Sequence, residues 1–280
     1  MTRRHVPAIA AALLLSLPIV VGGAYSALAA VGVVGVGAAG FTTQHLSAVL
    51  TSANTWRGIV WTLGTAGVAT IAASGAAFFV ALRVRQSRTG RVLAVLPMAV
   101  PNVAAALAAL LMLGQSGWLS RLTHKLGLTP TPADFPALVY DPAGVSLVMA
   151  FAWKEFPYLA LTALAVLLTD TRELEEVART LGATRRQAFW RVTWPRLWRG
   201  TSPAVLAAFA FLVGQYEMPA LLAPSDPTAL SLLTYERSID PDLARRGEAY
   251  VLALLALAFC GLLVAAHAAW RDRAGAGVDW

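Results

Sequence analysis

Apolar residues gather into six long runs along the chain, and the stretches between the runs hold most of the charged side chains. A helix needs about 20 mostly apolar residues to cross a bilayer, and it satisfies its own backbone hydrogen bonds within lipid. The pattern therefore predicts an all-α membrane protein with six transmembrane helices. Because the runs occupy most of the chain, we expect a single transmembrane domain over residues 1–280, with spans at about 8–36, 58–82, 92–113, 144–168, 202–224 and 248–270.

The first run has a second interpretation as a cleavable signal peptide. Arg3 and Arg4 precede it, and the small residues Ala27–Ala29 resemble a cleavage site. Its apolar character nevertheless continues to about Gly40, well past the roughly 7–15 residues of a signal-peptide core. We therefore expect a retained span that is long enough to tilt or to extend beyond the bilayer.

Composition supports membrane insertion, with 58% hydrophobic and 13% charged residues and a mean hydropathy of +0.63. Soluble domains carry about 25% charged residues. A net charge of +7 would fit a nucleic-acid partner, but its distribution argues otherwise: 15 of the 22 Lys and Arg lie at the N-terminus or after spans two, four and six. This bias predicts that both termini are cytoplasmic, and no nucleic-acid partner is needed to explain the charge.

The two long segments on the opposite side are expected to be loops. Residues 114–144 contain four prolines, which exclude a long helix, and a short amphipathic piece at Trp118–Leu126. Residues 223–249 are similar in character.

The sequence lacks the common motifs of nucleotide-binding, metal-binding and catalytic sites. It contains no GxxxxGK[ST] phosphate loop, no HExxH metal motif and no GxSxG nucleophile turn, and Cys260 is a lone thiol within span six. We therefore expect a protein that is not an enzyme, with no catalytic residues, no metal site and no bound cofactor.

A charged stretch at 169–200 interrupts the apolar pattern between spans four and five. Asp170 and Glu173 are spaced to cap a helix, whose apolar face would carry Leu174, Val177, Ala178 and Leu181. Gly182 follows this face, at the position where a left-handed residue ends a helix.

A second short helix is predicted directly after this corner. Thr184 and Gln187 have capping-box spacing, Phe189 and Val192 share one side, and Pro195 would end or kink the helix. The stretch is thus a cytoplasmic helix-turn-helix whose apolar face has no visible partner in the loop.

Three explanations account for different features of this stretch. A DNA-binding helix-turn-helix normally packs on a third helix, for which two flanking spans leave no room. A loop that only obeys the positive-inside rule explains the arginines but not the paired caps and the apolar face. Docking of a partner on the apolar face explains all of these features.

The spacing also resembles the EAA loop of ABC importer permeases, which reads Glu-Ala-Ala, three residues, Gly, nine residues, Ile-x-Leu-Pro. Glu176-Val177-Ala178, then Gly182-Ala183, then Val192-Thr193-Trp194-Pro195 keep this spacing. Trp194 is the one large departure, and it would alter the fit to the partner. Tyr140–Leu161 and Gly214–Pro224 resemble further segments of permeases for polyamines, thiamine, iron and sulfate.

The resemblance implies a type I importer fold in a bacterial cytoplasmic (inner) membrane, together with a set of partners. Such permeases work as identical or similar pairs on two ATPase subunits, which use the ATP, and they receive solute from an extracytoplasmic binding protein. It also implies that the ATPase-coupling residues are Glu176, Ala178, Gly182, Ala183, Val192 and Pro195.

Charged residues within the spans are candidates for the translocation pathway, because charge in the membrane interior is costly and usually faces a cavity or a partner. The candidates are Lys154, Glu155, Gln215, Tyr216 and Glu217. An ion pair between Lys154 and Glu217, or a location near the external interface, would explain them structurally instead. A different class of function, a proton-coupled carrier that uses Glu217 and works without an ATPase, also stays open. The mixed charges do not select a solute.

Overall fold

The computed structural model describes residues 6–37, 40–169 and 171–275, and in these residues all regular secondary structure is helical. Five helical stretches in this part are long and apolar enough to cross a membrane: Ala53–Val84, Asn102–Lys125, Val145–Leu168, Arg185–Gly214 and Leu243–Arg273. A shorter apolar helical stretch covers Ser16–Ala30. The all-helical, multi-pass character is thus confirmed, whereas the number of six spans stays a prediction.

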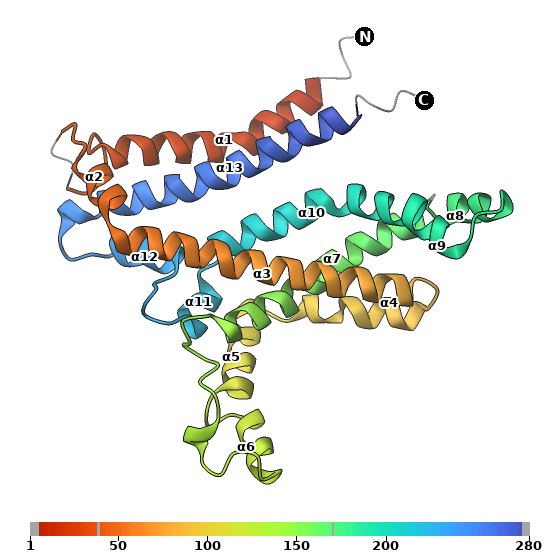
Figure 1. The fold of residues 1–280 in the computed structure, drawn as a ribbon. Coiled ribbons are helices and arrows are strands. Elements are labelled where there is room, and N and C mark those ends of the chain that lie inside the picture. Colours follow the sequence, from red (N-terminus) through yellow and green to blue (C-terminus); the bar gives the residue numbers. More distant parts are fainter. Residues whose placement is uncertain (1–5, 38–39, 170, 276–280) are drawn as a thin grey trace. The chain divides into compact units, whose positions relative to one another are not determined.

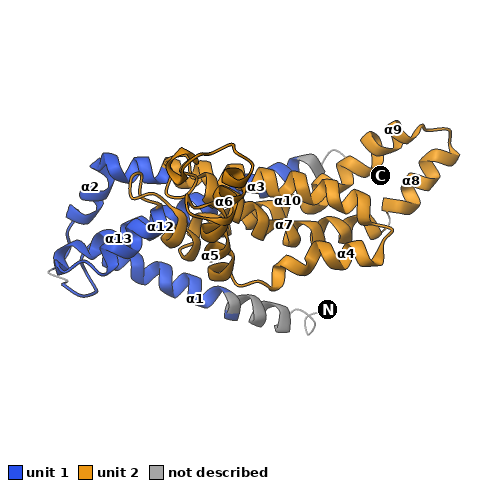
Figure 2. Ribbon diagram, turned by 90° about the horizontal axis from the view of Figure 1, so that it is seen from below, with its two compact units in different colours: residues 1–59, 230–280 blue, residues 60–229 orange. Residues whose placement is uncertain are grey.

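The contacts between residues divide the chain into two compact units (Figure 2). One comprises residues 1–59 with 230–280, and the other comprises residues 60–229. The first unit contains α1 (Val6–Ala30), α2 (Gln44–Thr51), the start of α3 (Ala53–Val84), α12 (Leu230–Ser238) and α13 (Gly247–Gly275). α1 and α13 run side by side (Figure 1), and Tyr25 meets Tyr250 edge to face with 5.8 Å between ring centroids.

The second unit contains the charged stretch and all of the candidate pathway residues. After α3 come α4 (Arg88–Val95), a 3-10 turn (Leu96–Ala99), α5 (Asn102–Leu113), α6 (Trp118–Lys125) and a 3-10 turn at Pro132–Asp134. These are followed by α7 (Val145–Leu168), α8 (Thr171–Thr180), α9 (Arg185–Ala188), a π-helical turn (Phe189–Thr193), α10 (Trp194–Gly214) and α11 (Glu217–Leu222).

Small residues let the central helices of this unit approach one another closely. The core between α3, α7 and α10 is built from Ala73, Ala77, Leu159, Ala160, Ala204 and Ala208. Next to it lies a larger-residue cluster of Phe78, Ala81, Ala163, Leu164, Leu167 and Leu197. Alanine leaves little side chain between helix backbones, as is usual where helices pack in lipid.

The observed helices depart from three of the predicted spans. Span one was expected to reach residue 36, but α1 ends at Ala30, and Gly32, Gly35 and Gly37 all have positive φ. Left-handed glycines cannot continue a right-handed helix.

Span three is not one helix. Pro101 has no N–H to bond the carbonyl four residues earlier, and it holds Val100 extended with ψ 127°, so the backbone breaks between the 3-10 turn and α5. Span five breaks for the same reason: Pro219 cannot bond the carbonyl of Gln215, α10 ends at Gly214, and Glu217 starts a separate short helix.

The loops contain more helix than was expected. The structure confirms the amphipathic helical piece that was predicted around Trp118–Leu126, and this piece is α6. Residues 223–249 were expected to be loop but contain α12, and α2 was not predicted.

Candidate functional site

The charged stretch forms a sharp corner between α8 and α9. Gly182 has φ +90°. Its N–H bonds the carbonyl of Arg179 at 3.1 Å, and the N–H of Ala183 bonds the carbonyl of Ala178 at 3.0 Å. These two bonds form a Schellman motif, in which glycine takes the left-handed position after the helix. The predicted glycine corner is confirmed. The predicted cap at Asp170 lies outside the described residues.

The predicted cap of the second helix is also confirmed. Gln187 donates its backbone N–H to Thr184 Oγ1 at 3.3 Å, and Thr184 donates its own N–H to Gln187 Oε1 at 2.9 Å. This reciprocal pair satisfies two backbone donors that the first turn of a helix leaves free.

Pro195 does not end the helical structure that begins at Arg185. A π-helical turn at Phe189–Thr193 leads into α10, and Pro195 lies in the first turn of α10. The N–H of Trp194 bonds the carbonyl of Phe189, five residues back. This wider turn accommodates the proline ring, so helical structure runs from Arg185 to Gly214.

The apolar face of α8 is open to the surroundings. Leu174, Val177 and Leu181 are 38%, 52% and 83% exposed. Apart from Gly182 and its two chain neighbours, no atom of the described residues would lie within 4 Å of a Cβ added at Gly182. Three exposed apolar side chains next to an open glycine are typical of a surface that another molecule covers.

Glu176 lies on the same helix, with its carboxylate exposed. Its Oε1 accepts from Arg172 Nε at 3.1 Å, one helical turn away, and both side chains are more than half exposed. Ala178 and Ala183 are partly buried beside the corner. Val192, in the π-helical turn, and Pro195, in the first turn of α10, are also partly buried. Glu176, Ala178, Gly182 and Ala183 therefore lie together on α8 and its corner, while Val192 and Pro195 lie beyond the second cap.

A partly buried ionic contact joins this helix pair to the end of α3. Arg85, just after α3, donates both terminal nitrogens to the Glu175 carboxylate at 2.9 and 3.4 Å, and Thr193 Oγ1 donates to the same carboxylate at 3.3 Å. The bond from Arg85 lowers the pKa of Glu175, and Thr193 adds to this effect. Sequence reasoning missed Arg85, Glu175 and Thr193, because their contacts join residues that are 90 and 18 positions apart.

Trp194 packs inward instead of pointing at a partner. Its ring meets Phe78 of α3 edge to face at 6.1 Å and lies 6.4 and 5.9 Å from Phe189 and Trp190. The large departure from the EAA pattern is thus accommodated within the core of this chain. Trp190, which is 54% exposed, is the aromatic of this cluster that is open to a partner.

The candidate pathway residues fall into two groups. Lys154 on α7 donates to the carbonyl of Val100 at 2.6 Å, at the break before α5. Glu155 is buried next to it, with 8% of the residue exposed. No ion pair joins Lys154 to Glu217 among the described residues, so the structural alternative of that pair is wrong.

The second group lies at the break between α10 and α11. Gln215 is buried, whereas Tyr216 and Glu217 are exposed, and α11 packs against α5 and α7. Each group therefore lies at a place where the helix backbone is interrupted. In the part of the chain that the structure describes, no three His, Cys, Asp or Glu side chains come close enough to hold a metal ion.

These features define a multi-pass helical membrane protein with an exposed, rigidly held helix corner between two of its long helices. The chain belongs to the family of binding-protein-dependent transport system inner membrane components, whose model matches residues 69–274. It is thus a membrane transport permease of the ABC importer kind.

Relatives in this family include permeases for different solutes. The chain is 30% identical over 132 residues to a probable sulfate transport system permease protein cysT of Chlorokybus atmophyticus, with 47% of this chain and 43% of that protein covered. It is 29% identical over 184 residues to the molybdenum transport permease ModB of Mycobacterium tuberculosis, with 64% and 66% covered. The chain thus matches less than half the length of the sulfate permease.

Solved structures support the fold. A chain of a bacterial ABC transporter involved in the import of the acidic polysaccharide alginate matches with a TM-score of 0.70 and 19% identity, covering 95% of this chain and 93% of that one. At this identity the likeness shows the fold alone.

Proposed function

We propose that this chain is the permease subunit of an ATP-driven importer, and that it forms the pathway for a small polar solute delivered by an extracytoplasmic binding protein. A separate pair of ATPase subunits supplies ATP hydrolysis, and a second identical or similar permease completes the pore. The observation that carries the proposal is the corner at Gly182, with its open surface and its exposed apolar face.

The corner is connected to the long helices on both of its sides. On one side it continues through α9 and the π-helical turn into α10, and on the other it is fixed by Glu175 to Arg85. α7 and α10 pack against each other. A partner that holds Leu174, Val177 and Leu181 and moves with ATP hydrolysis would therefore move α7 and α10 together, which would switch the pathway between its two sides.

The solute pathway is proposed to pass two breaks in the helix backbone, one before α5 and one between α10 and α11. The polar groups at these breaks come from Lys154, Glu155, Gln215, Tyr216 and Glu217. Irregular backbone within a membrane protein is tolerated where it lines a cavity or is buried in protein.

The coupling role is tested at Gly182, in the complete complex reconstituted in vesicles. Gly182→Asp is expected to abolish ATP-driven uptake, because a charged side chain would occupy the surface that meets the ATPase. Gly182→Asn is the control for the backbone, since asparagine tolerates the left-handed conformation and a Cβ at this position has open space among the described residues. Normal uptake by Gly182→Asp would contradict the proposal.

Glu176→Lys tests the same surface through its charge. We expect loss of copurification with the ATPase and loss of uptake, while the protein still inserts. Uptake that needs no ATPase and stops when an uncoupler is added would instead identify a proton-coupled carrier.

A further inference from the structure

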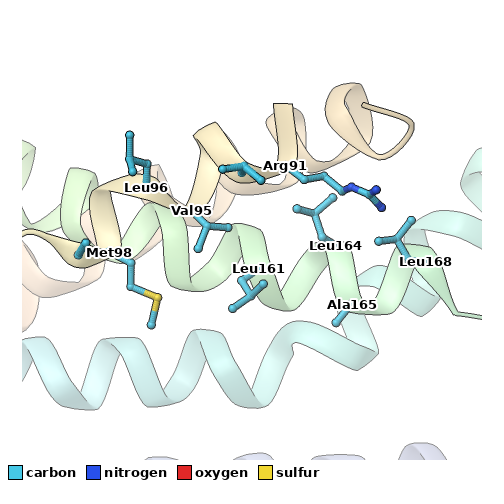
Figure 3. Close-up of a pocket in the computed structure, with 10 residues that line it drawn as sticks. Arg91, Val95, Leu96, Met98, Leu161, Leu164, Ala165 and Leu168 are labelled. Atoms are coloured by element: carbon cyan, nitrogen blue, oxygen red, sulfur yellow. The ribbon is translucent and has the colours of Figure 1, made fainter. Parts of the chain in front are cut away.

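An apolar groove runs along the outside of α7 in the second unit (Figure 3). It has a volume of about 630 Å³, and its walls are α4 and the following 3-10 turn on one side and α7 on the other. Leu96, Met98, Leu161 and Leu168 line it and are 62%, 49%, 46% and 48% exposed. Apolar side chains this open in a membrane protein face either lipid or another protein.

One end of the groove carries a positive charge. Arg91 is the one charged residue among those that line it, and in the close-up its guanidinium extends toward the Leu164 and Leu168 end of α7 (Figure 3). Among the described residues no carboxylate pairs with Arg91. Arg88 lies three positions earlier on α4, and residues at this spacing share one face of a helix.

From this combination we propose that the groove is a binding site for an anionic phospholipid. The acyl chain lies along Met98 and Leu161, and the phosphate is held by Arg91 with Arg88. Both parts match the chemistry of the ligand, because arginine binds phosphate through several N–H donors and the rest of the wall is apolar. The site goes beyond the proposed transport function and does not depend on it.

A second copy of the chain fits the groove less well. An apolar helix laid over it would bury the Arg91 guanidinium without a partner of opposite charge, which is strongly unfavourable. A lipid phosphate provides that charge. The Arg91 end of the groove lies at the end of α7 that leads into α8, which the charge bias places on the cytoplasmic side, so the lipid would come from the cytoplasmic leaflet.

The test measures lipid retention by the full chain in detergent, using native mass spectrometry with added phosphatidylglycerol or phosphatidylcholine of equal chain length. The wild-type protein is expected to prefer phosphatidylglycerol. Arg91→Gln should lower the affinity for phosphatidylglycerol about tenfold, because one charge-assisted bond is lost, and should lower the affinity for phosphatidylcholine less, because the choline cation offsets the phosphate charge. Arg91→Lys should keep the preference.

Two further variants control this result. Arg271→Gln removes an exposed arginine far along the chain and should keep the preference for phosphatidylglycerol. Leu161→Trp fills the groove without a change of charge and should lower retention of both lipids.

Two results would overturn the proposal. One is an unchanged phosphatidylglycerol preference in Arg91→Gln. The other is efficient disulfide cross-linking between two copies through a cysteine placed at Val95 in a Cys260→Ser background, since this would show that protein and not lipid covers the groove.

Discussion

Glu175 and Glu176 are neighbours on α8, yet the fold gives them opposite surroundings. Glu175 faces Arg85 and Thr193 with 21% of its side chain exposed, whereas Glu176 is 62% exposed and pairs with Arg172 on the preceding turn of its own helix. Glu175 therefore stabilises the corner, and Glu176 is available to a partner. The EAA spacing identified Glu176, but it could not identify Glu175, because Arg85 is distant in sequence.

Glu175→Gln should destabilise the second unit by about 1–3 kcal/mol at neutral pH, because a charge-assisted contact is lost and the Arg85 guanidinium is left partly buried. Thermal unfolding of the full chain in detergent measures the effect. Glu173→Gln, an exposed neighbour on the same helix, is the matched control and should change little.

The effect of Glu175 should also depend on pH. The pKa of its carboxyl is lower in the folded protein than in the unfolded chain, chiefly because Arg85 bonds the charged form. Its stabilisation is therefore fully present above the unfolded pKa of about 4.3 and is lost as the pH falls through the folded value. The stability difference between wild type and Glu175→Gln should be constant near neutral pH and shrink below about pH 4. A difference that grows on acidification would contradict this account.

At the scale of elements, local signals were reliable and proline breaks were misjudged. The fourth span was predicted at 144–168 and helix α7 covers Val145–Leu168, and the glycine corner and the Thr184 cap of the charged stretch were predicted correctly. Hydropathy averages over a broken helix, so the third and fifth spans were drawn as continuous although Pro101 and Pro219 remove the bonds that continuity requires. The π-helical turn has no sequence signal of this kind.

Thr184→Ala should loosen the corner without unfolding the chain. The substitution removes the capping hydroxyl of α9, which costs about 1 kcal/mol. Amide hydrogen exchange should speed up about fivefold at Gln187 and Ala188, which corresponds to that free energy. Thr180→Ala removes a hydroxyl whose bond returns to its own helix, at Val177, and should leave exchange in α9 unchanged.

Lys154 joins α7 to the broken third span, and this contact could not be predicted, because the two residues lie 54 positions apart. Lys154→Met should lower the stability of the full chain by about 1–3 kcal/mol, since the Val100 carbonyl would lose its donor. Thermal unfolding in detergent checks this, with Lys125→Met on α6 as the exposed control. Equal unfolding temperatures for the two variants would show that the bond contributes little.

At the scale of the whole molecule, the sequence pattern predicted an all-helical membrane protein and its family, because both depend on properties that repeat along the chain. The grouping of residues 1–59 with 230–280 could not be predicted, since it depends on contacts between the two ends of the chain, such as Ala30 and Val49 with Leu230 and Val251. No periodicity within either end indicates its partner.

The orientation in the membrane is a separate prediction that rests on the charge distribution. With the termini in the cytoplasm, α6 must lie outside and the corner at Gly182 inside. In a Cys260→Ser background, Lys125→Cys should react with a membrane-impermeant maleimide added to intact spheroplasts, and Arg186→Cys should react only after the membrane is opened. Both side chains are exposed, so burial does not decide the result.

Two controls are needed to interpret this labelling experiment. Labelling of both cysteines after solubilisation shows that each thiol is reactive, and the unmodified Cys260→Ser protein shows the background. Labelling of both cysteines from the outside would show that α7 does not cross the membrane between them. It would also remove the Gly182 corner from the side on which ATP is available, and the coupling proposal would fail with it. The opposite pattern, with Arg186→Cys labelled first, would reverse the orientation and have the same consequence.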